Sequence, residues 1–373
     1  MPTNALDYIT IKGFKSIASI EKLELRPINV VIGANGSGKS NFIGAFAFLH
    51  AIREGRLRDY VTAAGGAEKV LYFGSKTTEK IEMRLAFRRP GVHVGLGYEL
   101  ILWPSGDDGL FPSDETAYDW NGIDNLVGGM GVNSLDNGRE AGVSNPKSRG
   151  IAGEARANLG TLRVYHLNDT SASSPMRKTA KVDDNRFLRT DGSNIAAFLY
   201  YLREKHEASY RLIARAIQLV APFFGEFLLE PRGLDSTYIR LEWRHKQSDQ
   251  YFDASSLSDG TLRFIALATL FLQPEMHRPS VILVDEPELG LHPYALEMLA
   301  ALVRQASVSS QVILSTQSSR LLDHFEPDDV LVASRVNGGT VLERQDPERL
   351  AKWLEDYSLG QLWEKNEIGG RPR

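Results

Sequence analysis

The sequence contains no cysteine. This absence excludes disulfide frameworks, thiolate catalysis and zinc sites of the usual cysteine type. The sequence also has no apolar run close to the roughly 20 residues that a membrane-spanning helix needs. Its N-terminus lacks the basic stretch followed by an apolar stretch that marks a signal peptide. We therefore expect a cytoplasmic protein without a membrane partner.

An excess of positive charge is absent as well, because 43 lysines and arginines stand against 47 aspartates and glutamates. The molecule as a whole has no field that would attract it to a polyanion, so nucleic acid, if bound, must meet a local basic patch. The length of 373 residues allows two or three domains around a substantial core.

The apolar pattern predicts an α/β protein. The first hundred residues combine stretches typical of strands with one amphipathic helix after Ser40. The expected strands cover residues 8–11, 20–25, 28–32, 81–87 and 93–103. Residues 104–160 are rich in Gly, Ser, Asn and Asp and have little periodicity, so we expect an insertion loop there.

The second half of the chain has two further patterns. Residues 194–220 predict two packed helices that form a small lobe. In the last third, expected strands at 281–284, 312–314 and 330–333 are separated by helices. This alternation favours a parallel sheet that is covered on both faces.

A glycine-rich segment between an apolar strand and an amphipathic helix fits the P-loop pattern. Its glycines let successive amides point at phosphates, and the helix N-terminus adds a partial positive charge. Lys39 should reach the β and γ phosphates of ATP, and Ser40 should bind Mg²⁺. The expected nucleotide-binding residues are Gly33, Ala34, Asn35, Gly36, Ser37, Gly38, Lys39, Ser40 and Asn41.

Two carboxylates follow the expected strand at residues 281–284. Ligands gather beyond the carboxyl ends of strands in open α/β sheets, so Asp285 should meet the Mg²⁺ ion beside Ser40. Side chains alternate along a strand, which leaves Glu286 to hold the attacking water and act as general base. We expect Glu286 and Lys39 to be the catalytic residues.

A second candidate anion site opens the expected helix after residue 258. Ser258, Asp259 and Gly260 place a hydroxyl and a glycine at its N-terminus. Because the P-loop of the same chain already holds the phosphates from the other side, this segment suits the nucleotide of a second subunit. The alternative is an ordinary N-cap.

Taken together, these motifs resemble those of the ATP-binding cassette-like ATPases of the SMC, RecF and OLD group, a compact kind of which occurs in bacterial anti-phage systems. The stretches that carry the likeness are residues 9–17, the P-loop ending in Asn41, and residues 285–293. The likeness covers roughly residues 1–100 and 190–335. It implies ATP and Mg²⁺ as cofactors, and a homodimer or higher oligomer that sandwiches ATP between one P-loop and the partner's signature, here Ser258, Asp259 and Gly260.

The resemblance also implies an α/β P-loop NTPase fold with a mixed sheet, antiparallel N-terminal strands, a small helical lobe and an insertion loop. The expected parts are the first half of the ATPase head (1–103), the insertion (104–190), the helical lobe (191–233), the second half of the head (234–335) and a C-terminal tail (336–373).

The sequence departs from the family pattern at several positions. Gln317 stands where the family has its switch histidine, so we expect it among the nucleotide-binding residues as well. It can hydrogen-bond a phosphate or water but cannot carry a proton charge. His292 replaces the aspartate of the D-loop. No Q-loop can be assigned, since the first glutamine of the chain is Gln218. These departures predict hydrolysis that is slow or differently triggered.

Three roles follow from the resemblance. The first is an ATP-gated dimer that regulates an effector of the nuclease or toxin kind in anti-phage defence. Because only 40 residues follow Ala333, too few for a nuclease domain, we expect the effector to be a separate protein encoded nearby. The second is a RecF-like DNA-repair ATPase that binds duplex DNA in the presence of ATP. The third, a transporter module, is disfavoured by the missing switch histidine and glutamine.

Two surface features bear on these roles. Candidate phosphate contacts for DNA are Arg53, Arg56 and Arg58, or Arg88 and Arg89, although such clusters are usually solvated faces. In the C-terminal tail, Trp363 either docks a partner or folds against its own domain.

Overall fold

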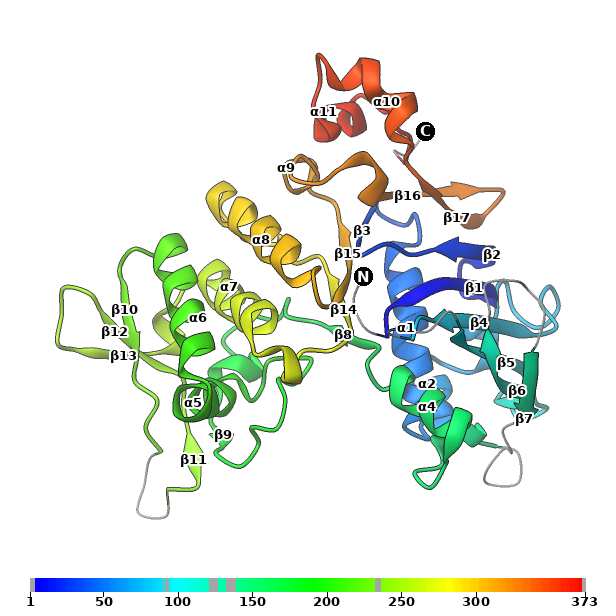
Figure 1. The fold of residues 1–373 in the computed structure, drawn as a ribbon, viewed down its shortest axis with the longest axis horizontal. Helices are drawn as coiled ribbons and strands as arrows, with labels where there is room; N and C mark the ends of the chain where they lie inside the picture. The colour runs from blue at the N-terminus through cyan, green and yellow to red at the C-terminus, as the bar shows by residue number, and fades with distance from the viewer. Residues whose placement is uncertain are drawn as a thin grey trace.

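The computed structural model describes residues 4–89, 91, 94–120, 127–131, 139–231 and 236–370, and for residues 127–131 it describes the backbone alone. Two six-stranded sheets lie side by side in the right half of Figure 1, and a helical lobe lies on the left. No helix in these ranges is long and apolar enough to cross a membrane. The expected residue His93 lies outside the described residues.

The first sheet is antiparallel, with the order β2-β1-β4-β5-β6-β7. Its strands are β1 (Leu6–Phe14), β2 (Ile17–Glu24), β4 (Ile81–Phe87), β5 (Gly95–Pro104), β6 (Leu110–Trp120) and β7 (Val127–Gly131). The helices α2 (Leu57–Ala63) and α3 (Ala67–Val70) lead into β4, and η2 (Gly142–Ser144) and α4 (Gly150–Leu159) follow β7. The expected N-terminal strands are confirmed, and all of them except the one at residues 28–32 belong to this antiparallel sheet.

The second sheet holds the nucleotide-binding motifs and has the order β17-β16-β3-β15-β14-β8. All neighbours are parallel except β17, which is antiparallel to β16. Its strands are β3 (Ile28–Ile32), β8 (Arg163–Tyr165), β14 (Val281–Asp285), β15 (Gln311–Thr316), β16 (Val330–Val336) and β17 (Gly339–Arg344). The three strands expected in the last third are confirmed.

The second sheet separates two hydrophobic cores. Along β14, Val281 and Leu283 pack into the core shared with α1 (Lys39–Arg53) and the first sheet, whereas Ile282 and Val284 pack into the core of the helical lobe. This alternation follows from the two-residue period of a strand, and because both faces are covered, every residue of the strand can be apolar. The sheet is covered on one face by α1 and the first sheet, and on the other by helices.

The helical lobe contains α5 (Ile195–Lys205) and α6 (Glu207–Val220), which confirms the two expected helices, and it extends beyond the expected residues 191–233 on both sides. They pack with α7 (Asp259–Leu272) and α8 (Pro293–Ala306) in one core. Short strands and turns fill the lobe: η3 (Pro175–Arg177), β9 (Ala180–Lys181), β10 (Phe224–Phe227), β11 (Tyr238–Ile239), β12 (Glu242–His245), β13 (Tyr251–Asp253), η4 (Ala254–Ser256) and η5 (Glu275–His277).

The expectation of an irregular insertion over residues 104–160 is wrong for much of that range. Strand β6 extends the first sheet and pairs with β5 along its whole length, and α4 packs against β5 and β6. The sequence did not predict this strand, because the carboxylate of Glu115 interrupts the apolar pattern expected of a buried strand. In the structure Glu115 is buried and accepts hydrogen bonds from Tyr98 Oη and from the amides of Gly142 and Val143.

The C-terminal region is folded against the second sheet. After β17 come α10 (Pro347–Leu354) and α11 (Leu359–Glu364), and α9 (Ser319–Leu322) and η6 (Pro327–Asp329) connect β15 to β16. Trp363 is half-buried and packs on the core of the helical lobe and second sheet. Of the two readings of the tail, the one that folds it against its own domain is confirmed.

Candidate nucleotide-binding site

The P-loop connects the end of β3 to the first turn of α1. Gly36 and Gly38 have φ angles of 78° and 103°, which lie in the left-handed region that glycine adopts without strain. Gly38 is the N-cap of α1 and has no side chain to bond the first amides of the helix. These amides are therefore free to bind an anion.

Lys39 lies buried under this loop, with 5% of its surface exposed. Its ammonium donates hydrogen bonds to the carbonyls of Gly33 (2.7 Å) and Ala34 (3.0 Å). Burial lowers the pKa of Lys39, and the charges of Glu286, Asp285 and Glu288 act in the opposite direction. The structure thus brings the P-loop lysine and the acidic segment together.

The strand β15 brings these two motifs to one edge of the sheet. It pairs with β3 on one side, where Thr316 is opposite Ile32, and with β14 on the other, where Ser315 is opposite Asp285. The hydroxyl of Ser315 donates a hydrogen bond to the Asp285 carboxylate. Sequence reasoning did not single out Ser315, because nothing local tells which strand lies between β3 and β14.

Glu286 leaves the strand with a φ angle of 46°, which is uncommon for a non-glycine residue. Its amide donates to the Ser315 carbonyl at 3.0 Å. Its carboxylate accepts a hydrogen bond from the side-chain amide of Gln317. Gln317, expected to replace a switch histidine, is therefore in direct contact with the expected general base.

Glu288 is a further carboxylate of the site, and sequence reasoning gave it no role. It accepts a hydrogen bond from the amide of Gln317 at 2.8 Å. Burial raises its pKa, and the charge of Glu286 acts in the same direction. Its Oε2 is buried without a hydrogen-bond partner in the described part of the chain.

The residues present fit a nucleoside triphosphate with Mg²⁺. The hydroxyl oxygen of Ser37 is buried under the P-loop without a described partner, and the space around Cα of Gly36 is open. A phosphate oxygen could replace the loop carbonyls as acceptor for Lys39. Ser40 is exposed at the start of α1, and Asp285 is half-buried at the same sheet edge, so both oxygens suit a hard cation such as Mg²⁺.

A network behind the P-loop holds it in place. Thr340 of β17 donates to the Ser37 carbonyl at 3.0 Å and lies 2.7 Å from the hydroxyl of Ser16. The Asn41 side chain donates to the same Ser16 hydroxyl at 2.7 Å. A side chain at Gly38 would collide with Thr340. Asn41 was expected to contact nucleotide, and in the structure its amide braces the loop against β1 and β2.

The C-terminal segment also touches the P-loop. The amide of Ala34 donates to the carbonyl of Gly370 at 2.8 Å, and Arg335 donates to the carbonyl of Gly36 at 3.0 Å. A cavity of about 690 Å³ lies between the P-loop, the end of β16 and this segment, with Asn35 among the residues that line it. Contacts between residues 299 or more positions apart in the sequence carry no local signal, and the sequence did not predict them.

The signature segment opens α7. Ser258 caps the helix and accepts a hydrogen bond from the amide of Thr261 at 3.2 Å. Ser258 and Asp259 are exposed. Gly260 packs so closely on the backbone of Gly290 that a Cβ atom would lie 2.3 Å from its carbonyl oxygen. The signature is therefore an exposed helix start that rests on the segment after the acidic pair.

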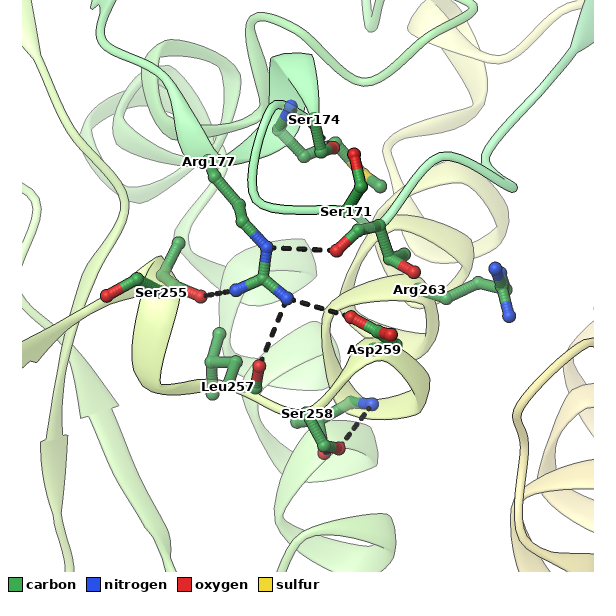
Figure 2. Close-up of polar contacts among 12 residues, drawn as sticks. Ser171, Ser174, Arg177, Ser255, Leu257, Ser258, Asp259 and Arg263 are labelled. Carbon is green, nitrogen blue, oxygen red and sulfur yellow. Dashed lines mark hydrogen bonds and ion pairs between the residues drawn. The ribbon is translucent and has the colours of Figure 1, made fainter.

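Arg177 ties this segment to the loop after β8 (Figure 2). Its side chain is 9% exposed. It donates to the carbonyls of Thr170 (3.0 Å), Ala254 and Leu257 (3.2 Å), and to the Asp259 carboxylate (3.0 Å). One guanidinium therefore fixes both sides of the signature, a role that no sequence motif announced.

A second arginine joins the same two parts. Arg263 of α7 is buried and donates to the carbonyls of Leu167 (3.1 Å) and Asn168 (2.8 Å). The loop after β8, the parallel neighbour of β14, thus contains Asn168 and no glutamine, in line with the missing Q-loop glutamine.

Comparison with known proteins agrees with this geometry. Residues 28–115 and 135–323 match the family model described as "AAA domain, putative AbiEii toxin, Type IV TA system". The match includes the P-loop, the signature and the acidic pair. The chain belongs to this family.

This AAA-domain chain also matches parts of chromosome partition proteins Smc. It is 42% identical over 65 residues to that of Mycolicibacterium paratuberculosis (16% of this chain, 5% of the relative). It is 39% identical over 108 residues to that of Desulfitobacterium hafniense (29% and 8%). The chain thus spans less than a tenth of the length of these curated relatives.

Solved structures of SMC heads share its fold. An SMC head bound to the C-terminal winged-helix domain of ScpA superposes with a TM-score of 0.63 at 18% identity, covering 92% of this chain and 99% of the other. The Pyrococcus furiosus SMC head with an extended coiled coil, bound to the C-terminal domain of ScpA, gives 0.62 at 16% identity, covering 95% and 99%. The AAA-domain chain thus has the expected P-loop NTPase fold, and its family implies ATPase activity with ATP and Mg²⁺.

Most arginines that were candidates for DNA contact are engaged within the protein. Arg88 pairs with Asp7, and Arg89 pairs with Asp119 (2.7 Å) and Glu154 (2.6 Å). Arg53 donates to the carbonyl of Arg156 at 3.1 Å and pairs with Glu54. These three arginines therefore have partners inside the protein, which neither the DNA-contact hypothesis nor the alternative of a solvated face predicted. Arg56 and Arg58 remain candidates.

Proposed function

We propose that this protein is a Mg²⁺-dependent ATPase that works as an ATP-gated dimer and regulates a separate effector protein in anti-phage defence. The carrying observation is the exposed, hydroxyl-capped start of α7, fixed by Arg177 and presented to solvent beside the segment after the acidic pair. A rigid, exposed anion-binding element supports contact with nucleotide on a second copy.

In this proposal each chain supplies both halves of a composite site. Gly33 to Asn41 hold the triphosphate, with Lys39 on the β and γ phosphates. Ser40 and Asp285 bind Mg²⁺, Glu286 activates water, and Gln317 holds Glu286 in place. Ser258, Asp259 and Gly260 of the partner copy close on the γ-phosphate. Closure thus requires ATP, because charge on the γ-phosphate is what the signature amides recognise.

The effector part of the proposal rests on the family. Its description refers to an AbiEii toxin and a type IV toxin–antitoxin system. An ATPase in such a setting has a clear physical use, since dimer closure can expose or hide a surface for a nuclease or toxin-like partner encoded nearby. ATP-dependent binding of duplex DNA, as in a RecF-like DNA-repair ATPase, is the competing role, and the internal pairing of Arg88 and Arg89 speaks against it.

The first experiment compares the mass of the Glu286→Gln protein with and without ATP and Mg²⁺, by light scattering after size exclusion. This variant should bind ATP and not hydrolyse it, so a mass that doubles with ATP supports the gated dimer. The neighbouring gene product is co-expressed in a second sample, where ATP-dependent recruitment supports the effector. A mass that ignores ATP counts against gating, and duplex DNA binding is then measured.

A mixing experiment tests the signature in trans. Lys39→Ala chains lack a working P-loop, and Ser258→Arg chains lack a working signature, so each protein alone should be inactive. A mixed dimer contains one site with both an intact P-loop and an intact signature, and it should recover ATPase activity. No recovery from two folded variants would contradict the sandwich.

A further inference from the structure

Three aromatic side chains converge in the helical lobe, away from the P-loop. Tyr201 lies in α5, His206 is the residue at which α5 ends and α6 begins, and His277 lies in η5. The hydroxyl of Tyr201 lies 3.3 Å from Nε2 of His206 and 3.3 Å from Nε2 of His277. The two Nε2 atoms are also 3.3 Å apart. The three polar atoms thus form an equilateral triangle.

Hydrogen bonds alone do not account well for this triangle. All three contacts are at the long limit for a hydrogen bond, where the usual range is about 2.7–3.2 Å. Two imidazole nitrogens that face each other can share only one proton, and the hydroxyl competes with that contact for the same lone pairs. The three polar atoms instead lie close enough together to be ligands of one ion.

The same triangle matches one face of a tetrahedral metal site. Ligand atoms about 2.0–2.1 Å from a tetrahedral centre lie about 3.3 Å from each other, which is the edge observed here. The three rings are also far from coplanar. The imidazole planes of His206 and His277 are inclined by 81° with centroids 5.1 Å apart, and Tyr201 is inclined by 83° to His277 and by 61° to His206.

We propose that Tyr201, His206 and His277 bind a divalent transition-metal ion of borderline softness, with water as the fourth ligand. Zn²⁺ is the ion that these ligands fit best. Imidazole nitrogen suits Zn²⁺, and a phenol oxygen that gives up its proton to solvent on binding adds a negative ligand. Among the described residues, no three His, Cys, Asp or Glu side chains form a metal site, and in this cluster the third ligand would be the tyrosine.

The site would join parts of the chain that are far apart in sequence. It links the junction of α5 and α6 to η5, and η5 ends four residues before β14, the strand that carries Asp285. A bound ion would therefore brace the helical lobe internally, at the segment that leads into β14. The proposal does not depend on the dimer or on the effector.

The test uses untagged full-length protein, treated with a chelator, dialysed and kept free of nucleotide, because a histidine tag or ATP would bind metal on its own. Zn²⁺ is titrated by calorimetry, and Co²⁺ is added in parallel as a spectroscopic probe. We expect one ion per chain with micromolar or tighter affinity, and the intense visible absorption of tetrahedral Co²⁺. Weak, pale octahedral Co²⁺ or no stoichiometric Zn²⁺ binding would overturn the proposal.

Single variants assign the ligands. His206→Gln and His277→Gln should each weaken Zn²⁺ binding by at least about 10-fold, and Tyr201→Phe should weaken it and shift the Co²⁺ spectrum. His324→Gln, at the end of α9, is the matched control and should bind Zn²⁺ as the wild type does. Thermal unfolding in chelator identifies any variant that does not fold. Equal Zn²⁺ affinity in the wild type and both folded histidine variants would contradict the assignment.

Discussion

The side-chain amide of Gln317 donates a hydrogen bond to the carboxylate of Glu286, across the carboxyl ends of β15 and β14. The backbone amide of Gln317 bonds Glu288 at the same time. Gln317, which directly follows β15, thus hydrogen-bonds both Glu286 and Glu288. Gln317 occupies the position where the family has its switch histidine, and it orients Glu286, the expected general base.

Replacing Gln317 by alanine tests this relationship. The backbone bond to Glu288 remains, while Glu286 loses its donor and gains freedom to leave the site. We expect kcat for ATP hydrolysis to fall about 10-fold, which is less than the loss expected when the general base itself is removed. ATP affinity should change little. Gln247→Ala, in a turn of the helical lobe, is the control. An unchanged kcat would mean that Gln317 does not position Glu286.

The P-loop lysine and the expected general base should separate binding from chemistry. Lys39→Ala removes an ammonium that serves the phosphates directly, so ATP affinity should fall by about 100-fold, the value of one or two charged hydrogen bonds. Glu286→Gln keeps a side-chain oxygen for Gln317, so it should retain ATP affinity and lose about 10²–10⁴ in kcat. Fluorescent-nucleotide binding and steady-state turnover measure the two effects. Equal loss of affinity in both variants would refute these roles.

Arg177 should be needed for a rigid signature. Arg177→Ala leaves the carbonyls of Ala254 and Leu257 without their donor, so we expect the free energy of unfolding to fall by about 1–3 kcal/mol. We also expect ATP-dependent dimerisation to weaken while ATP affinity of the monomer is retained. Denaturant unfolding and light scattering measure these effects.

Two further variants show which contact of Arg177 matters. Asp259→Asn removes only an exposed ion-pair partner and should change stability by no more than about 0.5 kcal/mol. Arg211→Ala removes an exposed arginine that pairs with Glu207 within α6, and it should behave like the wild type in dimerisation. If Arg211→Ala and Arg177→Ala impair dimerisation equally, the special role of Arg177 is refuted.

Asp329 predicts a pH dependence of stability. Burial raises its pKa to about 6, and the charge of Asp328 acts in the same direction. Because the folded pKa lies above the unfolded one, this group contributes stability below about pH 4, and the contribution is lost as the pH rises through about 6. Asp329→Asn should therefore gain about 1–2 kcal/mol relative to the wild type between pH 4 and pH 7, discounted for partial exposure. Denaturant unfolding at both pH values measures it, and parallel curves would contradict it.

The local motifs were readable from the sequence because their physics is local. A strand of four apolar residues, a glycine loop at a helix start and a hydroxyl cap each depend on neighbours within a few positions. The P-loop, Asp285, Glu286 and the start of α7 were therefore located correctly as elements. Their chemical roles are predictions that the variants of Lys39, Glu286 and Arg177 test.

Other features could be decided only by the tertiary structure. Sequence does not tell which strand separates β3 from β14, so the bonds from Ser315 to Asp285 and from Gln317 to Glu286 had no local signal. Strand β6 was not predicted because Glu115 is a charged residue in its interior. This carboxylate can be buried only because Tyr98 of β5 and the amides of Gly142 and Val143 donate hydrogen bonds to it, and the sequence does not show these partners. Arg177 reaches a signature about 80 residues away. Local composition determines which elements form, whereas the partners of buried polar groups are determined by how distant elements pack, because a buried charge or carbonyl is satisfied by whatever the fold places within hydrogen-bond reach.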